Sequence, residues 1–168
     1  HDPDNAPPTK MRIGNMFVTF AQQTSASLNN RFNPSSRVET AGVIIMDNNI
    51  KVHLEDIEMY YQVWSRNRDN IVGEFPRWFI DHKKVEESDD EKRYTGDDGK
   101  KERYTYLTGS MPLDGDQNEG YALLLTKFVV LHSRFLEIYT CEDRMLEVHD
   151  LVDQFEDCED ITMSLLVS

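Results

Sequence analysis

The stretch Val43-Ile44-Ile45-Met46-Asp47-Asn48-Asn49-Ile50 decides the predicted fold. A short apolar run rich in β-branched residues is typical of a strand buried on both faces. In open α/β sheets, ligands bind just beyond the carboxyl ends of such strands. The pattern therefore predicts that the polar triplet stands where a sheet presents a binding site. Asp-Asn-Asn is also typical of a plain turn, because these side chains bond to nearby backbone and tolerate the left-handed conformation.

Composition indicates one packed domain. The chain has 168 residues, of which 39% are hydrophobic, and its formal net charge is −13. This acidity argues against binding to the phosphate backbone of nucleic acid. No apolar run reaches the roughly 18 residues needed to cross a bilayer, and no signal peptide is visible. The sequence begins with His1 rather than Met. Three alternatives therefore stay open, namely a mature chain, a trimmed chain and a partial chain.

Periodicity outlines alternating strands and helices. Leu54, Ile57, Tyr61 and Trp64 recur at helical spacing, which predicts a helix with Trp64 in the core. Residues 145–155 show the same spacing, and residues 161–167 fit a helix that begins with acidic residues. Strands are expected over residues 16–20, 38–46, 71–73, 104–107 and, as a central strand, 121–131.

This order predicts an α/β layer fold. Residues 1–15 are expected to form a flexible lead-in, because they are rich in Pro and polar residues. Residues 16–168 are expected to form the domain. Within it, residues 81–103 are nearly all charged or polar and predict an exposed insertion.

Several motifs together resemble one known family. They are Ser27-Leu28-Asn29-Asn30-Arg31-Phe32, Glu39-Thr40-Ala41 before the strand and its polar triplet, Leu125-Thr126-Lys127-Phe128, and Asp157-Cys158-Glu159-Asp160-Ile161-Thr162-Met163-Ser164. Their order and spacing are similar to those of the exostosin-type glycosyltransferase domain, glycosyltransferase family 64. The similarity runs from about Phe17 to the last residue.

The resemblance implies a fold, a reaction and a compartment. The implied fold is GT-A, a Rossmann-like α/β fold for nucleotide-diphospho-sugars, here truncated at both ends. The implied reaction transfers N-acetylglucosamine or a related hexose from a UDP- or GDP-sugar to a glycan or glycolipid acceptor, with retention at the anomeric carbon. The implied location is the lumen of the endoplasmic reticulum or Golgi, with a membrane tether only if a segment outside this sequence supplies it.

The resemblance also implies a metal site, with a change in its motif. The family carries an Asp-x-Asp triplet at the end of a strand, and its last Asp meets Mn²⁺ or Mg²⁺, which neutralises the diphosphate. The corresponding residues here are Asp47, Asn48 and Asn49, so Asp47 and Asn49 are the expected metal ligands. Asn49 offers only a neutral oxygen, which weakens or abolishes metal binding.

The remaining site residues follow from the same resemblance. Asn30, Arg31, Asp47 and Asn48 are expected to bind the nucleotide-sugar, Arg31 because its fork of donors suits a diphosphate. Glu159 and Asp160 are expected to be catalytic, as acceptors of a hydroxyl proton or stabilisers of an oxocarbenium-like transition state. Asp160 is favoured as the main group. Acids at a helix N-terminus are also typical of simple stabilisation by the helix dipole.

Two questions stay open from the sequence alone. A disulfide bond at Cys158 is implied by the family, but the family's partner has no match here, so Cys158 pairs with Cys141 or stays free. The altered triplet also favours an alternative function, a catalytically inactive relative that binds glycans or a partner. A third alternative is an unrelated acidic α/β domain.

Overall fold

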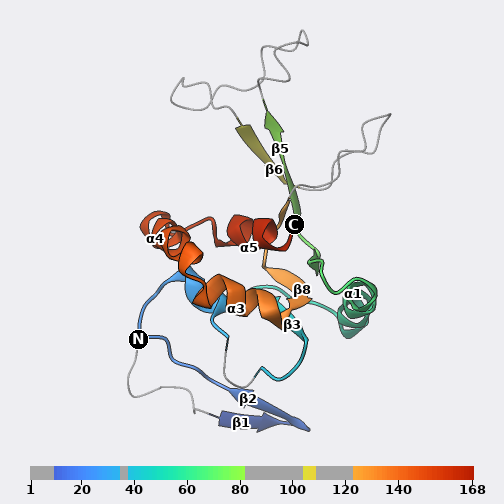
Figure 1. Cartoon of the computed structure of the whole chain (residues 1–168). Helices are drawn as coiled ribbons and strands as arrows, with labels where there is room; N and C mark the ends of the chain where they lie inside the picture. The colour runs from blue at the N-terminus through green and yellow to red at the C-terminus, as the bar shows by residue number, and fades with distance from the viewer. Residues whose placement is uncertain (1–9, 35–37, 82–103, 109–122) are drawn as a thin grey trace, which may run out of the picture.

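The computed structural model describes residues 10–34, 38–81, 104–108 and 123–168. The described part is a mixed α/β structure (Figure 1). Its elements, in chain order, are β1 (Lys10–Ile13), β2 (Met16–Thr19), η2 (Leu28–Phe32), β3 (Gly42–Met46), α1 (Leu54–Arg66), β4 (Val72–Gly73), β5 (Pro76–Asp81), β6 (Tyr104–Thr108), β7 (Leu123–Leu124), β8 (Phe128–His132), α3 (Ser133–Cys141), η3 (Asp143–Met145), α4 (Leu146–Phe155) and α5 (Glu159–Val167).

The strands form three small sheets. One has the order β3-β8-β4, a second has the order β6-β5-β7, and β1 and β2 form a separate hairpin. Each of these pairs is antiparallel in the described residues. The α/β class predicted from the sequence is therefore confirmed, whereas the GT-A assignment stays a prediction.

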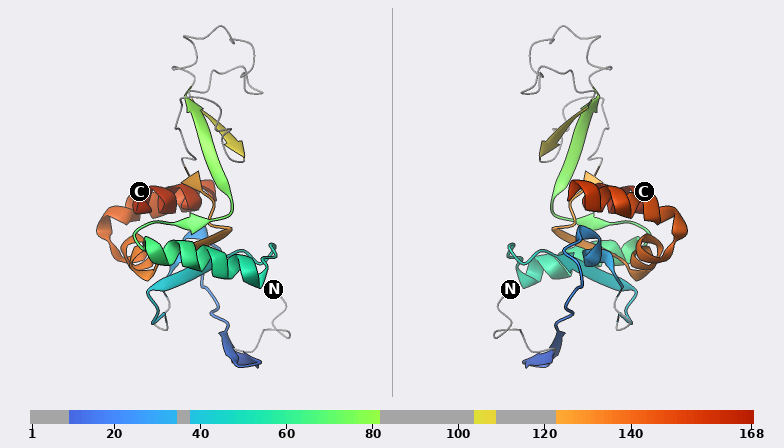
Figure 2. Two further views of the ribbon diagram at one scale, coloured as in Figure 1. Left: turned by 90° about the vertical axis from the view of Figure 1, so that its right-hand side faces the viewer. Right: turned by 90° about the vertical axis from the view of Figure 1, so that its left-hand side faces the viewer.

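Strand β8 is the buried centre of the first sheet. Phe128 and His132 on one face lie against Tyr60 and Trp64 of α1, with ring centroids 5.2 and 6.4 Å apart. Val129 and Leu131 on the other face belong to the main apolar core, together with Phe135, Leu136 and Tyr139 of α3 and Met163 of α5. Helix α1 thus covers one face of the sheet and the α3–α5 group the other (Figure 2).

The prediction that residues 43–46 are buried on both faces is wrong. Strand β3 lies at the edge of its sheet, and Ile44 and Met46 are 42% and 53% exposed. Only Val43 and Ile45 pack on the core. Composition identifies a strand but not its place in the sheet. The central strand, which is buried on both faces, is β8.

The expected long strand over residues 121–131 is also divided. Residues 123–124 form β7, residues 128–132 form β8, and Thr126 and Lys127 make the turn between them. The two strands belong to different sheets. The chain changes sheet where the two polar residues interrupt the apolar run.

Helix α1 is confirmed, with a different buried stripe. Trp64 is 1% exposed, as expected of a core residue, but Leu54 and Tyr61 are 76% and 42% exposed. Tyr60 takes the inward place by contacting Phe128. The helix packs closely on β3, since a Cβ at Gly42 would lie 2.7 Å from Trp64 Cζ3.

The expected lead-in, residues 1–15, contains strand β1. This strand pairs with β2 in register from Lys10↔Thr19 to Ile13↔Met16. The expected insertion, residues 81–103, lies outside the described residues apart from Asp81, which ends β5. Among the described residues, no helix has the length and apolar character required to span a membrane.

Candidate functional site

The pairing of β3 with β8 places Asp47 beside Lys127. The register brings Met46 opposite Phe128, and the ladder continues one step when the Asp47 backbone N–H donates to the Lys127 carbonyl at 2.8 Å. Asp47 follows the last residue of β3, and Lys127 precedes the first residue of β8. The polar triplet therefore does begin at a strand end, as predicted.

The short helix η2 brings Arg31 to the same place. Its N-cap is Ser27, whose hydroxyl accepts from the Asn29 backbone N–H at 3.1 Å. The Asn29 side chain accepts from the Tyr139 hydroxyl at 2.6 Å, and the Phe32 ring is fully buried against Tyr139. These contacts fix η2 on α3, so that Arg31 projects from an anchored turn.

The first turn of α5 supplies Glu159 and Asp160. Asp160 Oδ1 accepts from the Thr126 backbone N–H at 2.7 Å and also from the Thr126 hydroxyl. Further along, the Ser164 hydroxyl donates to the Leu124 carbonyl at 2.9 Å. The β7–β8 connection therefore sets the position of the helix start, and with it the orientation of Asp160.

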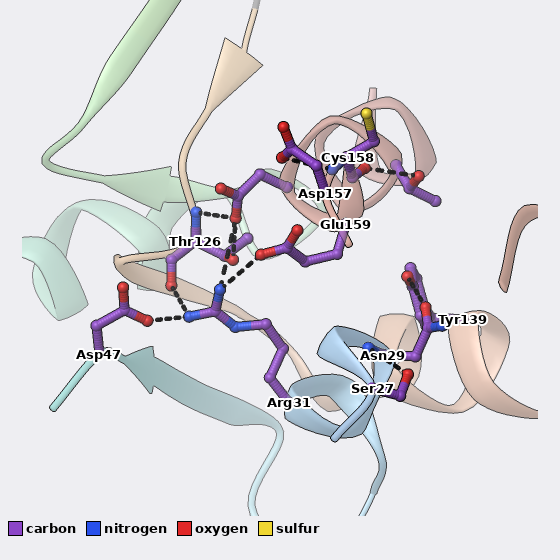
Figure 3. A network of polar contacts seen from close by, with 11 residues as sticks. Ser27, Asn29, Arg31, Asp47, Thr126, Tyr139, Asp157, Cys158 and Glu159 are labelled. Carbon is purple, nitrogen blue, oxygen red and sulfur yellow. Dashed lines mark hydrogen bonds and ion pairs between the residues drawn. The ribbon is translucent and has the colours of Figure 1, made fainter. Parts of the chain in front are cut away.

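Arg31 joins two acidic corners of the site, Asp47 at the end of β3 and Glu159 with Asp160 at the start of α5, as Figure 3 shows. Its Nη2 forms an ion pair with Asp47 and donates to the Thr126 carbonyl at 3.3 Å. Its Nη1 lies 2.9 Å from Glu159 Oε1 and 3.9 Å from Asp160 Oδ1. The Glu159 side chain is only 7% exposed, and Arg31 is the cation that compensates its buried carboxylate.

A pocket opens beside this network. Its volume is about 540 Å³, within the usual range for a small-molecule site. Its walls come from η2, the end of β3, the β7–β8 turn and the start of α5, and the lining residues are Ser27, Leu28, Arg31, Met46, Asp47, Asn48, Lys127, Glu159 and Asp160. Asp47 and Asp160, assigned to donor binding and to catalysis by the family resemblance, thus border one pocket.

The structure brings together some of the predicted site residues and not others. Arg31, Asp47, Asn48, Glu159 and Asp160 line the pocket. Asn30 does not line it, since its amide donates to the Ser25 carbonyl at 2.9 Å. Asn49, the predicted second metal ligand, is exposed and also lies outside the lining. The chemical roles predicted for all of these residues stay predictions.

The two polar residues of the β7–β8 turn were missed as candidates. Thr126 is fully buried and holds Asp160, and Lys127 lines the pocket. Both belong to a motif that carried the family resemblance. The signal that could have identified them is the pair of polar residues inside an otherwise apolar run, because a buried run rarely carries polar groups without partners.

The residues present do not fit a hard divalent cation. Within the described ranges there is no group of three or more His, Cys, Asp or Glu side chains that could hold a metal ion. Asp47 is the one carboxylate of the triplet, and Arg31 already neutralises it. Mn²⁺ and Mg²⁺ favour several oxygen ligands, with carboxylates among them.

The electrostatics of the site affect two neighbouring groups. Burial, followed by the charges of Glu159, Asp153 and Asp160, raises the pKa of Tyr139 far above its ordinary value. Partial burial, then Asp157 and Glu159, raises the pKa of the Cys158 thiol. Cys141 and Cys158 are both free and exposed, so the disulfide that was one of the two alternatives for this pair is not formed.

Comparison with known proteins gives a consistent set of relatives. The chain is 30% identical over 162 residues to "Glycosyltransferase family protein 64 C3" of Arabidopsis thaliana, covering 95% of this chain and 42% of that protein. It is 28% identical over 151 residues to "Exostosin-like 2" of Mus musculus, covering 90% and 40%. It is 26% identical over 163 residues to "Glucosamine inositolphosphorylceramide transferase 1" of Arabidopsis thaliana, covering 97% and 17%.

These matches define both the extent and the family of the chain. The chain spans less than half the length of these relatives. The model of the "Glycosyl transferase family 64 domain" matches residues 2–168, so the similarity begins well before Phe17, where the motifs suggested it would start. With nearly every residue matched, this chain belongs to glycosyltransferase family 64.

Proposed function

We propose that this chain forms the donor-binding part of a retaining glycosyltransferase. The reaction moves N-acetylglucosamine or a related hexose from a UDP- or GDP-sugar to a glycan or glycolipid acceptor. The observation that carries the proposal is the pocket of about 540 Å³ bordered by Asp47 at one corner and by Glu159 and Asp160 at the other. A catalytic group must lie close to the bond that breaks, and here carboxylates from distant parts of the chain meet at one cavity.

Asp160 is the group best placed to act on the sugar. Its Oδ1 is held by Thr126, while no described residue bonds to its Oδ2. A carboxylate that lines the pocket and has one oxygen held by the protein can stabilise positive charge at the anomeric carbon or accept a hydroxyl proton. Arg31 has a supporting role, because it orients Asp47 and Glu159 at the same time.

The names of relatives support the proposed acceptor class. One is a "Glucosamine inositolphosphorylceramide transferase 1" and another a "Glycosylinositol phosphorylceramide mannosyl transferase 1", both from Arabidopsis thaliana. These names describe transfer of a hexose or an amino sugar to a lipid-linked acceptor. Such a reaction agrees with a location in the endoplasmic reticulum or Golgi lumen, which we include in the proposal. No step depends on Mn²⁺ or Mg²⁺, since the side chains here do not fit it.

The test combines binding and turnover. Calorimetry with UDP and with GDP, in Mn²⁺ and in EDTA, should give a dissociation constant of about 1 mM or below for one nucleotide. NMR of the chain with the matching nucleotide-sugar and a glycan or glycolipid acceptor should show a product that retains the anomeric configuration. An absence of heat for both nucleotides in both buffers contradicts the proposal, and so does an inverted product.

A second candidate is a non-catalytic module that kept the fold. Asn49 favours it, because this residue puts a neutral amide where the family's triplet has its second carboxylate. The variant Asn49→Asp separates the two. A gain of Mn²⁺-dependent UDP-sugar hydrolysis indicates a lapsed enzyme site, whereas binding of acceptor glycans without hydrolysis in either protein favours the module.

A further inference from the structure

The pocket contains two cations with very different surroundings. Arg31 is committed to protein acceptors, since its two terminal nitrogens contact Asp47, Glu159 and the Thr126 carbonyl. Lys127 lines the same pocket and is partly buried, and none of the ion pairs among the described residues includes its ammonium group. Among the described residues of the pocket, Lys127 is therefore the cation left for an incoming anion.

The local backbone holds Lys127 in place. Its carbonyl accepts from the Asp47 backbone N–H at 2.8 Å, and the next residue, Phe128, is fully buried in β8. Its predecessor Thr126 is fully buried and hydrogen-bonded to Asp160. Lys127 thus belongs to an anchored turn, and its backbone lies directly beside that of Asp47.

We propose that Lys127 binds the diphosphate of the nucleotide-sugar and supplies the charge that a divalent cation would otherwise provide. This inference rests on the proposed function of the same pocket. Breaking the bond between sugar and diphosphate leaves additional negative charge on the diphosphate, and a fixed ammonium group nearby stabilises it. Lysine is a common phosphate ligand that acts as a point charge.

The ligand atoms that the Asp47-Asn48-Asn49 triplet can offer to a metal also favour this inference. Asn49 is outside the pocket lining, and Asp47 is neutralised by Arg31, so the described residues leave no free carboxylate at the triplet to attract a hard cation. Binding of the nucleotide should therefore proceed without added metal. Among the described residues, the positive charge left to contact the diphosphate is that of Lys127 in the β7–β8 turn.

The experiment measures UDP and GDP binding by calorimetry in EDTA and in Mn²⁺. The wild-type chain should bind its nucleotide equally well in both buffers. Lys127→Met should weaken binding in EDTA about 10-fold or more, the usual effect of losing one charged hydrogen bond. Lys127→Arg should remain within about 3-fold of the wild type, because it keeps the charge. Lys10→Met, on the exposed strand β1, is the matched control and should bind like the wild type.

The outcomes separate this inference from the proposed function. Nucleotide binding that requires Mn²⁺, or that is unchanged in Lys127→Met, overturns the role of Lys127 and leaves the transferase proposal standing. An absence of binding by the wild type in either buffer overturns both. Thermal unfolding of each variant checks that the chain is folded, and a nucleotide that raises the unfolding temperature of the wild type in EDTA but not that of Lys127→Met supports the inference independently.

Discussion

Arg31 Nη1 lies 2.9 Å from Glu159 Oε1, which joins the short helix η2 to the first turn of α5. The Glu159 side chain is 7% exposed and that of Arg31 is 21% exposed. Removing one member of a buried ion pair leaves the other charge without compensation, which costs more than the intact pair contributes. The contact therefore holds together two segments that the sequence separates widely.

Loss of Arg31 should destabilise the protein more than loss of one of the carboxylates that pair with it. We expect Arg31→Met to lower the free energy of unfolding by about 3 kcal/mol, because Glu159 is left buried and unpaired. Adding Glu159→Gln to that variant should restore part of the loss. Urea denaturation measures these changes, and Glu147→Gln on the exposed side of α4 is the control. Strictly additive effects of the two substitutions would contradict the coupling.

Asp160 should affect turnover far more than binding. We expect Asp160→Asn to reduce sugar transfer by about 100-fold or more, as for loss of a positioned acid or base, with nucleotide affinity nearly unchanged. The amide oxygen can still accept from Thr126, so the helix start should be preserved. Rates of transfer and calorimetry on the same preparations measure the two effects. Asp150→Asn, an exposed residue of α4, should match the wild type; equal rates for Asp160→Asn would remove the catalytic role.

Tyr139 should make stability fall at alkaline pH. Its phenol is buried and its pKa is raised above the ordinary value of about 10, so the native state keeps a proton that the unfolded chain releases. Stability from this group is complete below pH about 10 and is lost as the pH rises further. Tyr139→Phe, which loses the hydrogen bond to Asn29, should cost about 1–2 kcal/mol at neutral pH, and this difference should shrink above pH about 10.

Urea denaturation over a pH series tests this behaviour. The exposed Tyr61 provides the matched control, and Tyr61→Phe should follow the pH dependence of the wild type. If wild type and Tyr139→Phe lose stability in parallel above neutral pH, the alkaline loss comes from other groups.

Much of the secondary structure could be predicted from the sequence because it depends on local patterns. Trp64 was correctly expected to lie on a helix with its side chain in the protein core, and the predicted strand at residues 71–73 overlaps β4. The burial of β3 was not predictable in this way, because edge and central strands can have the same composition. The partner strand decides burial, and β8 is distant in the sequence.

The candidate site could be predicted to a similar extent. Asp47, Glu159 and Asp160 were expected to be site residues on the strength of the family resemblance, and all three line the same pocket. The ion pairs that Arg31 makes with both corners could not be predicted, because they depend on how η2 packs against α3. Lys127 was overlooked because a turn inside the expected central strand was not recognised.

The Cys158 thiol should react more slowly in the folded protein than in the unfolded chain. Partial burial, Asp157 and Glu159 raise its pKa, and the thiolate is the nucleophile. In a Cys141→Ser background, the pH midpoint of alkylation by iodoacetamide should therefore be higher without urea than in it. Asp157→Asn should move the native midpoint down. A native midpoint at or below that of the unfolded chain would contradict the assigned electrostatics.

Gly42 should be needed for the packing of α1 on β3. A Cβ at this position would lie 2.7 Å from Trp64 Cζ3 and 2.9 Å from Cη2, and Trp64 is fully buried and cannot move away easily. We expect Gly42→Ala to lower the free energy of unfolding by about 1–3 kcal/mol, the usual cost of overpacking. Urea denaturation measures this loss, and Ala41→Ser at the exposed neighbouring position should change stability by less than about 0.5 kcal/mol. A neutral Gly42→Ala would mean that α1 can shift on the sheet. In that case nucleotide affinity should change as well, because β3 carries Asp47 at its end.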